Sequence, residues 1–123
     1  MDIELLKDIR IFSKLDDRSL RALSGVLQLQ RYEDSDVIIH QGSISDGIYI
    51  ILDGTIRVSH RTSTGAIIVL NTLESGSVFG TLSTIDSGVR GAKCMAVGAT
   101  QVAYMTKVDF LELMDSTSAF ALS

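Results

Sequence analysis

Between residues 26 and 105 the chain breaks into short β-type segments that are separated by glycine, aspartate and serine. Alternation of apolar and polar residues, as in Leu27-Gln28-Leu29-Gln30, is typical of a strand with one buried face. The segments expected to be strands are 26–32, 37–39, 48–52, 55–60, 66–73, 93–97 and 100–105. This spacing predicts a mainly β protein with a jelly-roll-like barrel at 26–105, although the pattern alone also fits other small β-barrels.

The turns of this barrel must be made without proline, because the chain has none and has ten glycines instead. Asp53-Gly54 lies between two expected strands and is the two-residue signal of a tight hairpin with a type I′ turn. The sequence therefore predicts that the chain reverses direction there, between 48–52 and 55–60. A polar loop at 61–65 is expected to make the next connection.

Helical patterns flank the strands at both ends. Leu20 and Leu23 recur at helical spacing, Asp16 or Asp17 would serve as the N-cap, and Gly25 would end the helix. Apolar residues at helical spacing also occur in 3–9, so the whole segment 1–25 is expected to be helical in character. Residues 106–109 resemble a capping box, which predicts a helix that begins at 107 within the C-terminal segment 107–123.

Composition limits the classes of protein that this chain can be. Its 123 residues, 46% of them hydrophobic, are enough for one domain with one core, expected at 1–123. The net charge is −4 and the 11 basic residues are scattered, so no cationic stripe for nucleic acid is present. Cys94 is the single cysteine and is expected to be a buried thiol, which fits a reducing, cytoplasmic compartment. The charged N-terminus and short apolar runs predict neither a signal peptide nor a membrane span.

Residues 77–92 have the composition of an anion-binding loop. An apolar pair, 78–79, ends a strand, Gly80 turns the chain, and 81–85 has the length of one helical turn. A helix N-terminus offers unpaired N–H groups and the positive end of its dipole. Arg90 follows, and its guanidinium carries a fork of donors that matches phosphate oxygens.

This stretch resembles the phosphate-binding cassette of the cyclic nucleotide-binding domain family, the module of the bacterial catabolite activator and of protein kinase A regulatory subunits. The residues that match the family pattern are Gly80, Leu82, Ser83, Arg90 and Ala92. Two positions depart from it. Thr81 stands where the family has a glutamate that accepts a hydrogen bond from the ribose, and Gly91 stands where a hydroxyl residue can select between bases.

A second stretch, Ile38–Ile56, carries the same resemblance about 40 residues earlier. The family pattern there is an apolar pair and a glycine, a turn, a strand that bears tyrosine, and another glycine. Here these features are Ile38-Ile39 with Gly42, Asp46-Gly47, Tyr49 and Gly54. Ser43 and Ser45 are mild departures. With both stretches in the family's order, the resemblance covers essentially the whole chain.

The resemblance implies a fold and a function. It implies a jelly-roll barrel whose flanking helices, 18–25 and 107–114, repack when a cyclic nucleotide binds. The ligand-binding residues that it implies are Gly80, Thr81, Leu82, Ser83, Arg90, Gly91 and Ala92. Since residue 91 lacks a hydroxyl, cAMP is favoured over cGMP. The implied partners are an output domain or protein outside this chain and, as in the bacterial activators, a second copy.

Alternatives remain open at this stage. Arg90 is either the phosphate ligand or a surface arginine beside a loop, and Thr81 either meets the ribose or caps the helical turn. The loss of glutamate also fits a degenerate module that is used for docking or oligomerisation, or a sensor of another small anion.

Catalysis has no support in the sequence. No nucleophile elbow, Walker loop or zinc-protease motif is present. His40 and His60 lie on different predicted strands without carboxylates or thiols at ligand spacing. We therefore expect no enzyme activity, no metal and no cofactor apart from the ligand.

Overall fold

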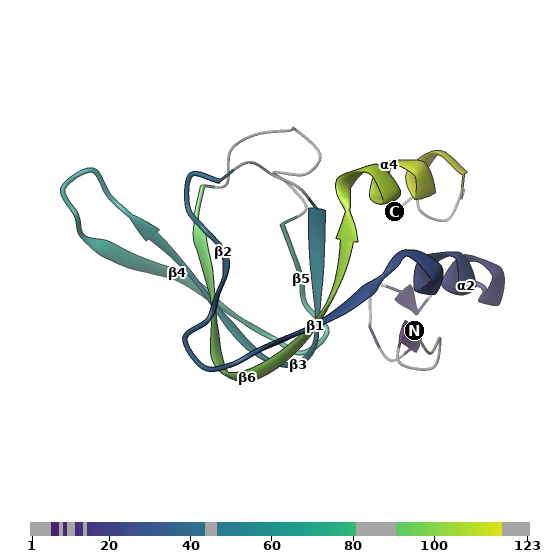
Figure 1. The fold of residues 1–123 in the computed structure, drawn as a ribbon, viewed down its shortest axis with the longest axis horizontal. Coiled ribbons are helices and arrows are strands. Elements are labelled where there is room, and N and C mark those ends of the chain that lie inside the picture. The colour runs from purple at the N-terminus through teal and green to yellow at the C-terminus, as the bar shows by residue number, and fades with distance from the viewer. Residues whose placement is uncertain are drawn as a thin grey trace.

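The structure is a computed structural model that describes residues 6–7, 9, 12–13, 15–43, 47–80 and 91–116. Two helices and six strands lie within these ranges over their full length. In chain order they are α2 (Asp17–Val26), β1 (Gln28–Tyr32), β2 (Val37–Ile39), β3 (Gly47–Arg61), β4 (Ile67–Glu74), β5 (Val78–Phe79), β6 (Lys93–Thr106) and α4 (Lys107–Ser116). The predicted mainly β fold with helices at its ends is confirmed (Figure 1).

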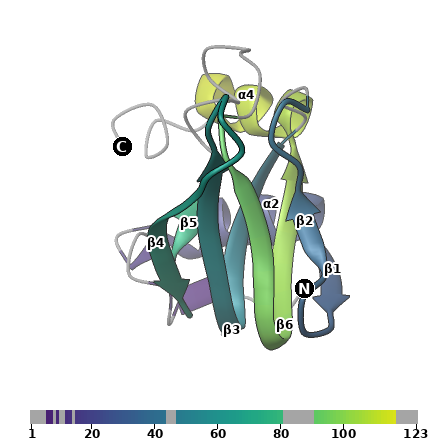
Figure 2. The same cartoon turned by 90° about the vertical axis from the view of Figure 1, so that its left-hand side faces the viewer.

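A long antiparallel pair, β3 with β6, forms the middle of the sheet (Figure 2). The first half of β3 pairs with β5, and the second half of β6 pairs with β1. Beyond the middle, β4 pairs with the second half of β3, while β2 pairs with the first half of β6. The two long strands therefore pass from one group of four strands to the other, which is the arrangement of a jelly roll.

The predicted hairpin at Asp53-Gly54 is wrong. β3 runs without reversal from Gly47 to Arg61 and pairs with β6 on both sides of these residues. The register shifts there, from Asp53 opposite Gln101 to Thr55 opposite Val97, so both strands bend at one place. Gly54 has φ +119°, a value open to glycine, which lets the strand bend instead of turning back. β6 also runs without reversal, from Lys93 to Thr106, so the two strands predicted at 93–97 and 100–105 are one strand.

The buried side chains form two clusters on opposite faces of the central pair. The helix-side core comprises Leu6, Ile9, Phe12, Leu20, Leu23, Leu27, Ile48, Ile50, Ala103 and Met105. The barrel core comprises Ile39, Tyr49, Ile51, Ile56, Phe79, Cys94, Ala96 and Val102. Because neighbouring residues of a strand point to opposite faces, the first half of β3 contributes alternately to both cores.

The two helices lie side by side at one end of the barrel (Figure 1). Asp16 is the N-cap of α2, as one of the two predicted choices, and its Oδ1 accepts a hydrogen bond from the Ser19 amide at 2.8 Å. Hydrogen bonds from Ser19, together with the charge of Arg18, hold the pKa of Asp16 below its usual value of 3.8. In α4 the Thr106 hydroxyl accepts from the Asp109 amide at 3.1 Å, which confirms the predicted start.

The helical segment predicted before α2 lies largely outside the described residues. Of the described residues there, Leu6 and Lys7 are α-helical and Phe12 has 3₁₀-helical conformation. Neither helix in the described part of the chain has the length and apolar character that a membrane span needs.

Candidate functional site

A cavity of about 380 Å³ opens between the two ends of the predicted cassette. It is lined by Ile39, Val58, Leu70, Phe79, Gly80, Gly91, Ala92 and Cys94. Gly80 stands where the cassette begins, and Gly91 and Ala92 stand where it ends. Three residues that the sequence predicts as ligand-binding therefore line one cavity. We call it the cassette cavity.

The other predicted ligand-binding residues are Thr81, Leu82, Ser83 and Arg90. They lie in 81–90, outside the described residues, so their roles stay predictions.

Aromatic packing fixes the start of the cassette. Phe79 pairs with Tyr49 of β3, and their rings stack with centroids 5.0 Å apart and planes 11° apart. The Tyr104 ring of β6 also packs against Tyr49, with centroids 4.9 Å apart and planes tilted by 50°. After Phe79, Gly80 takes φ +90°, which ends the strand and turns the chain, as the sequence predicts.

A β-bulge shapes the wall that β4 provides. Val58 of β3 faces Asn71, but the next residue, Ser59, faces Val69, so Leu70 is the extra residue of the bulge. Bulges redirect side chains and are frequent beside binding sites. Leu70 lines the cavity although 58% of its surface is exposed, so it borders both the cavity and solvent.

A histidine holds the end of the cassette. The His60 ring, near the end of β3, contacts the Gly91 carbonyl oxygen through Nδ1 at 2.8 Å. Since a carbonyl oxygen only accepts hydrogen bonds, Nδ1 carries the proton in this contact. The sequence shows His60 only as a strand residue. Nothing in its spacing predicts that its ring reaches a residue 31 positions later.

The walls of the cassette cavity are apolar. None of the lining residues named above carries a formal charge, and Cys94 is a buried thiol outside any disulfide, as predicted. A charged phosphate held there would therefore take its counter-charge from elsewhere, and Arg90 is the predicted source. Within the part of the chain that the structure describes, no three metal-ligating side chains gather into a cluster.

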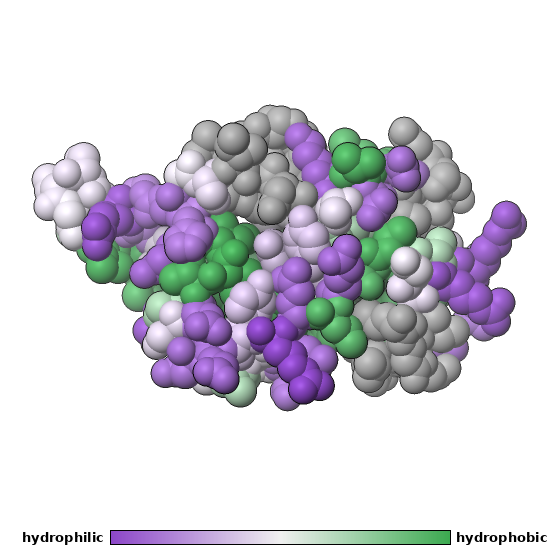
Figure 3. All heavy atoms as spheres, in the orientation of Figure 1, coloured by the Kyte–Doolittle hydropathy of each residue, from purple (hydrophilic) through white to green (hydrophobic). Residues whose placement is uncertain are grey.

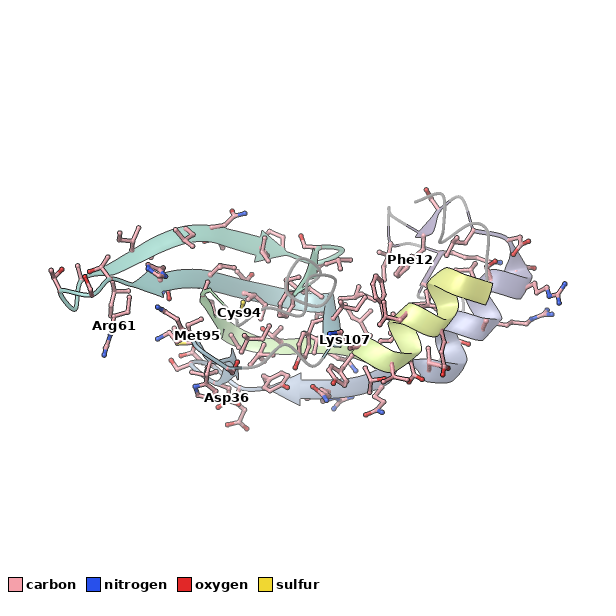
Figure 4. All side chains as sticks on the ribbon, turned by 90° about the horizontal axis from the view of Figure 1, so that it is seen from above. Phe12, Asp36, Arg61, Cys94, Met95 and Lys107 are labelled. Atoms are coloured by element: carbon pink, nitrogen blue, oxygen red, sulfur yellow. The ribbon has the colours of Figure 1, made fainter. Side chains whose placement is uncertain are left out.

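A second, wider cavity of about 490 Å³ lies towards the β3–β4 loop. Its lining residues are Gln41, Gly42, Ser59, Arg61, Thr62, Ser63, Ile67 and Lys93. It contains none of the predicted ligand residues, and both polar atoms of the Gln41 side chain are engaged by the Arg61 backbone, at 2.7 and 3.0 Å. Arg61 lies near the loop that joins β3 to β4, whereas Cys94 lies within the sheet (Figure 4). The smaller cavity is therefore the candidate site.

Sequence reasoning missed most of the cavity wall. Ile39, Val58, Leu70, Phe79 and Cys94 come from five different strands and meet only in the folded barrel. As single apolar residues in strands they look like any other core position, so the sequence held no signal that set them apart.

Comparison with known proteins places the chain in a family. Residues 29–117 match the family model of the cyclic nucleotide-binding domain. That match covers most of the chain, so the protein belongs to the cyclic nucleotide-binding domain family. The resemblance inferred from the two sequence stretches is confirmed.

Similar proteins include regulatory subunits and a bacterial activator. The cAMP-dependent protein kinase regulatory subunit of Schizosaccharomyces pombe is 31% identical over 110 residues, which are 89% of this chain and 26% of that protein. The regulatory domain of Toxoplasma gondii PKA, solved with cAMP, superposes with a TM-score of 0.87 at 25% identity, over 98% of this chain and 46% of that one. The Thermus thermophilus catabolite activator protein gives 0.84 at 25%, over 91% and 53%. This chain thus spans about a quarter to a half of the length of these three proteins.

Proposed function

We propose that this chain is a regulatory module that binds a cyclic nucleotide in the cassette cavity, with cAMP favoured over cGMP, and relays binding to an output domain or partner outside this chain. The observation that carries the proposal is that Gly80, Gly91 and Ala92, from both ends of the cassette, line one cavity. Family membership supports it, as does the cAMP named with the Toxoplasma gondii structure. The proposed role is that of a cytoplasmic sensor, not of an enzyme.

The cavity suits a ligand with an apolar part and an anionic part. Its volume of about 380 Å³ falls within the ~300–1,000 Å³ of small-molecule sites. Side chains such as Val58 and Leu70 offer apolar surface to a base. The phosphate would sit at the cassette, where N–H groups of the predicted helical turn and the Arg90 guanidinium would donate to its oxygens.

The relay would use the strands that the two cores share. Tyr49 and Ile51 belong to the barrel core beside the cavity, and Ile50, between them, belongs to the helix-side core. Phe110 of α4 packs against the helix-side core. A change around the ligand thus has a short path to both helices. The ligand shifts the helices only as far as its affinities for the two states differ.

A docking module that binds no nucleotide is the second candidate. Thr81 replaces the glutamate that the family uses for the ribose, and threonine cannot supply a charged acceptor at that reach. Four successive apolar residues of β4, at 67–70, are 48–59% exposed, and apolar atoms reach the surface at this hairpin (Figure 3). Such a surface fits docking to another protein.

A thermal-shift titration with cAMP and with cGMP tests the proposal. A ligand at a hundred times its dissociation constant stabilises the folded state by ~2.7 kcal/mol, which raises Tm by roughly 10 °C for a domain of 123 residues. Arg90→Ala should weaken binding by about tenfold to a hundredfold, because it removes a charged hydrogen bond to phosphate.

Arg57→Ala is the matched control. Arg57 is an exposed residue of β3 that does not line the cassette cavity, so its loss should leave binding unchanged. If neither nucleotide at millimolar concentration shifts the Tm of the parent, the docking module takes the place of the sensor. Thr81→Glu would then show whether that one position had abolished binding.

A further inference from the structure

We propose that His60 is a positioning residue of the cassette cavity: its Nδ1–H bond to the Gly91 carbonyl holds the chain where it leaves the cassette, and nucleotide affinity depends on this bond. The inference rests on the proposed function. It concerns a residue of β3 that lies 31 positions from its partner and does not itself line the cavity.

The bond continues the contact between β3 and the chain before β6 beyond the end of the backbone ladder. The last paired residues of the two strands are Ser59 and Lys93. His60 is the next residue of β3, and its ring reaches Gly91, two residues before β6 begins. On its other side His60 pairs with Ile68 of β4, which fixes its backbone. The His60 side chain thus adds one more hydrogen bond between β3 and the end of the cassette.

Within the ranges that the structure describes, the His60 ring is the side chain that hydrogen-bonds to Gly91. Gly91 has no side chain to pack, and a Cβ built there would meet nothing within 4 Å. Glycine also loses more conformational freedom on ordering than any other residue. Gly91 lines the cavity, so any movement of its peptide changes the cavity wall directly.

The fold does not depend on this ring in the way that it depends on the cores. His60 is half-buried and belongs to neither core cluster. Removing the bond should therefore loosen the end of the cassette while β3, β4 and β6 stay paired. That difference separates a positioning role from a structural one.

The test compares two substitutions of nearly equal size. His60→Asn keeps an N–H donor at the position of Nδ1, and His60→Leu removes it. In cAMP titrations of the full chain, we expect His60→Leu to bind about threefold to tenfold more weakly than the parent, the range of one neutral hydrogen bond. His60→Asn should stay within about twofold of the parent.

His40 provides the matched control, because it is exposed and no described residue hydrogen-bonds to its ring. His40→Asn and His40→Leu should both bind as the parent does. Melting curves without ligand show whether each variant is folded. Equal affinities for His60→Leu, His60→Asn and the parent would overturn the inference, and so would equal losses in both His60 variants.

Imidazole ¹⁵N NMR of the ligand-free parent tests the bond itself. The His60 signals should show the tautomer with the proton on Nδ1. The tautomer with the proton on Nε2 would overturn the inference, whether or not a nucleotide binds. A parent that binds neither nucleotide overturns the proposed function and the affinity part of this inference. The NMR measurement would then still show whether the hydrogen bond between His60 and Gly91 forms. A parent that binds cAMP with unchanged affinity in His60→Leu overturns this inference alone.

Discussion

The two halves of β3 are surrounded very differently. Residues 47–51 are buried in succession, since one face packs on the helix-side core and the other on the barrel core. Past Gly54 burial is interrupted, with Ile56 buried, Arg57 exposed and Val58 on the wall of the cassette cavity. The first half is fixed by packing on both faces, and the second half keeps space on one face.

The neighbours of each half explain this contrast. Helices cover the outer face of the first half, whereas the second half pairs with β4, an edge strand in the described sheet. β4 leaves apolar side chains at 67–70 half exposed. One strand therefore serves as a rigid support at one end and as a ligand-facing wall at the other. The predictions that follow test this contrast.

The largest effect is expected from a cavity in the first half. Ile50 is fully buried, so Ile50→Ala should reduce the free energy of unfolding by about 2–5 kcal/mol, since the buried surface and its packing are both lost. Val69→Ala, at a side chain that is 56% exposed on β4, should cost less than about 1 kcal/mol. Urea unfolding measures both. Equal losses would show that the halves do not differ in packing.

The bend between the halves should give the next effect. Gly54 and Gly65 both have positive φ, so alanine at either position is strained by about 1–3 kcal/mol. A Cβ at Gly54 would also lie 2.8 Å from the Thr100 Cα, whereas one at Gly65 meets nothing within 4 Å. Gly54→Ala should therefore cost about 1–3 kcal/mol more than Gly65→Ala in the same urea experiment. Equal losses of stability in the two variants would mean that β6 shifts to make room for the Cβ at residue 54.

At the cavity, substitution of Gly91 should change ligand affinity more than it changes the stability of the fold. Space is open around Gly91, and its φ is not positive, so Gly91→Ala should raise the free energy of unfolding by about 0.4–1 kcal/mol. Gly91→Ser adds the hydroxyl and should raise the affinity for cGMP relative to cAMP by about threefold to tenfold over the alanine variant. Calorimetric titrations measure the ratio, and equal ratios in both variants would remove residue 91 from base selection.

The smallest effect is expected at the cap of α2, which packs on the first half. Asp16→Asn keeps an acceptor but removes the charge at the helix N-terminus, so it should be slightly less stable than the parent at neutral pH. The folded pKa of Asp16 is lowered, so its contribution is complete above the usual value of 3.8 and is lost as the pH falls through the lowered pKa. Melting temperatures of the pair should converge in acid. A constant difference would contradict this.

Much of the fold could be predicted from local sequence. Helix α2 at Asp17–Val26, its cap at Asp16, the strand at Val37–Ile39 and the end of β5 at Phe79 follow from periodicity, capping and glycine chemistry. The hairpin predicted at Asp53-Gly54 does not form, because a glycine with positive φ serves a bend in a long strand as well as a tight turn. The local sequence is the same in both cases, and the choice depends on whether β6 continues alongside.

The candidate site divides in the same way. The sequence by itself predicted the cassette, with Gly80, Gly91 and Ala92 at its ends, because a turn, a helical turn and an arginine that bind one anion together are adjacent in the chain. Only the tertiary structure decided which apolar residues form the wall, that Leu70 is the bulged residue, and that His60 reaches Gly91. These contacts join residues that are far apart in sequence, and strand register, which is set by packing across the whole sheet, brings them together.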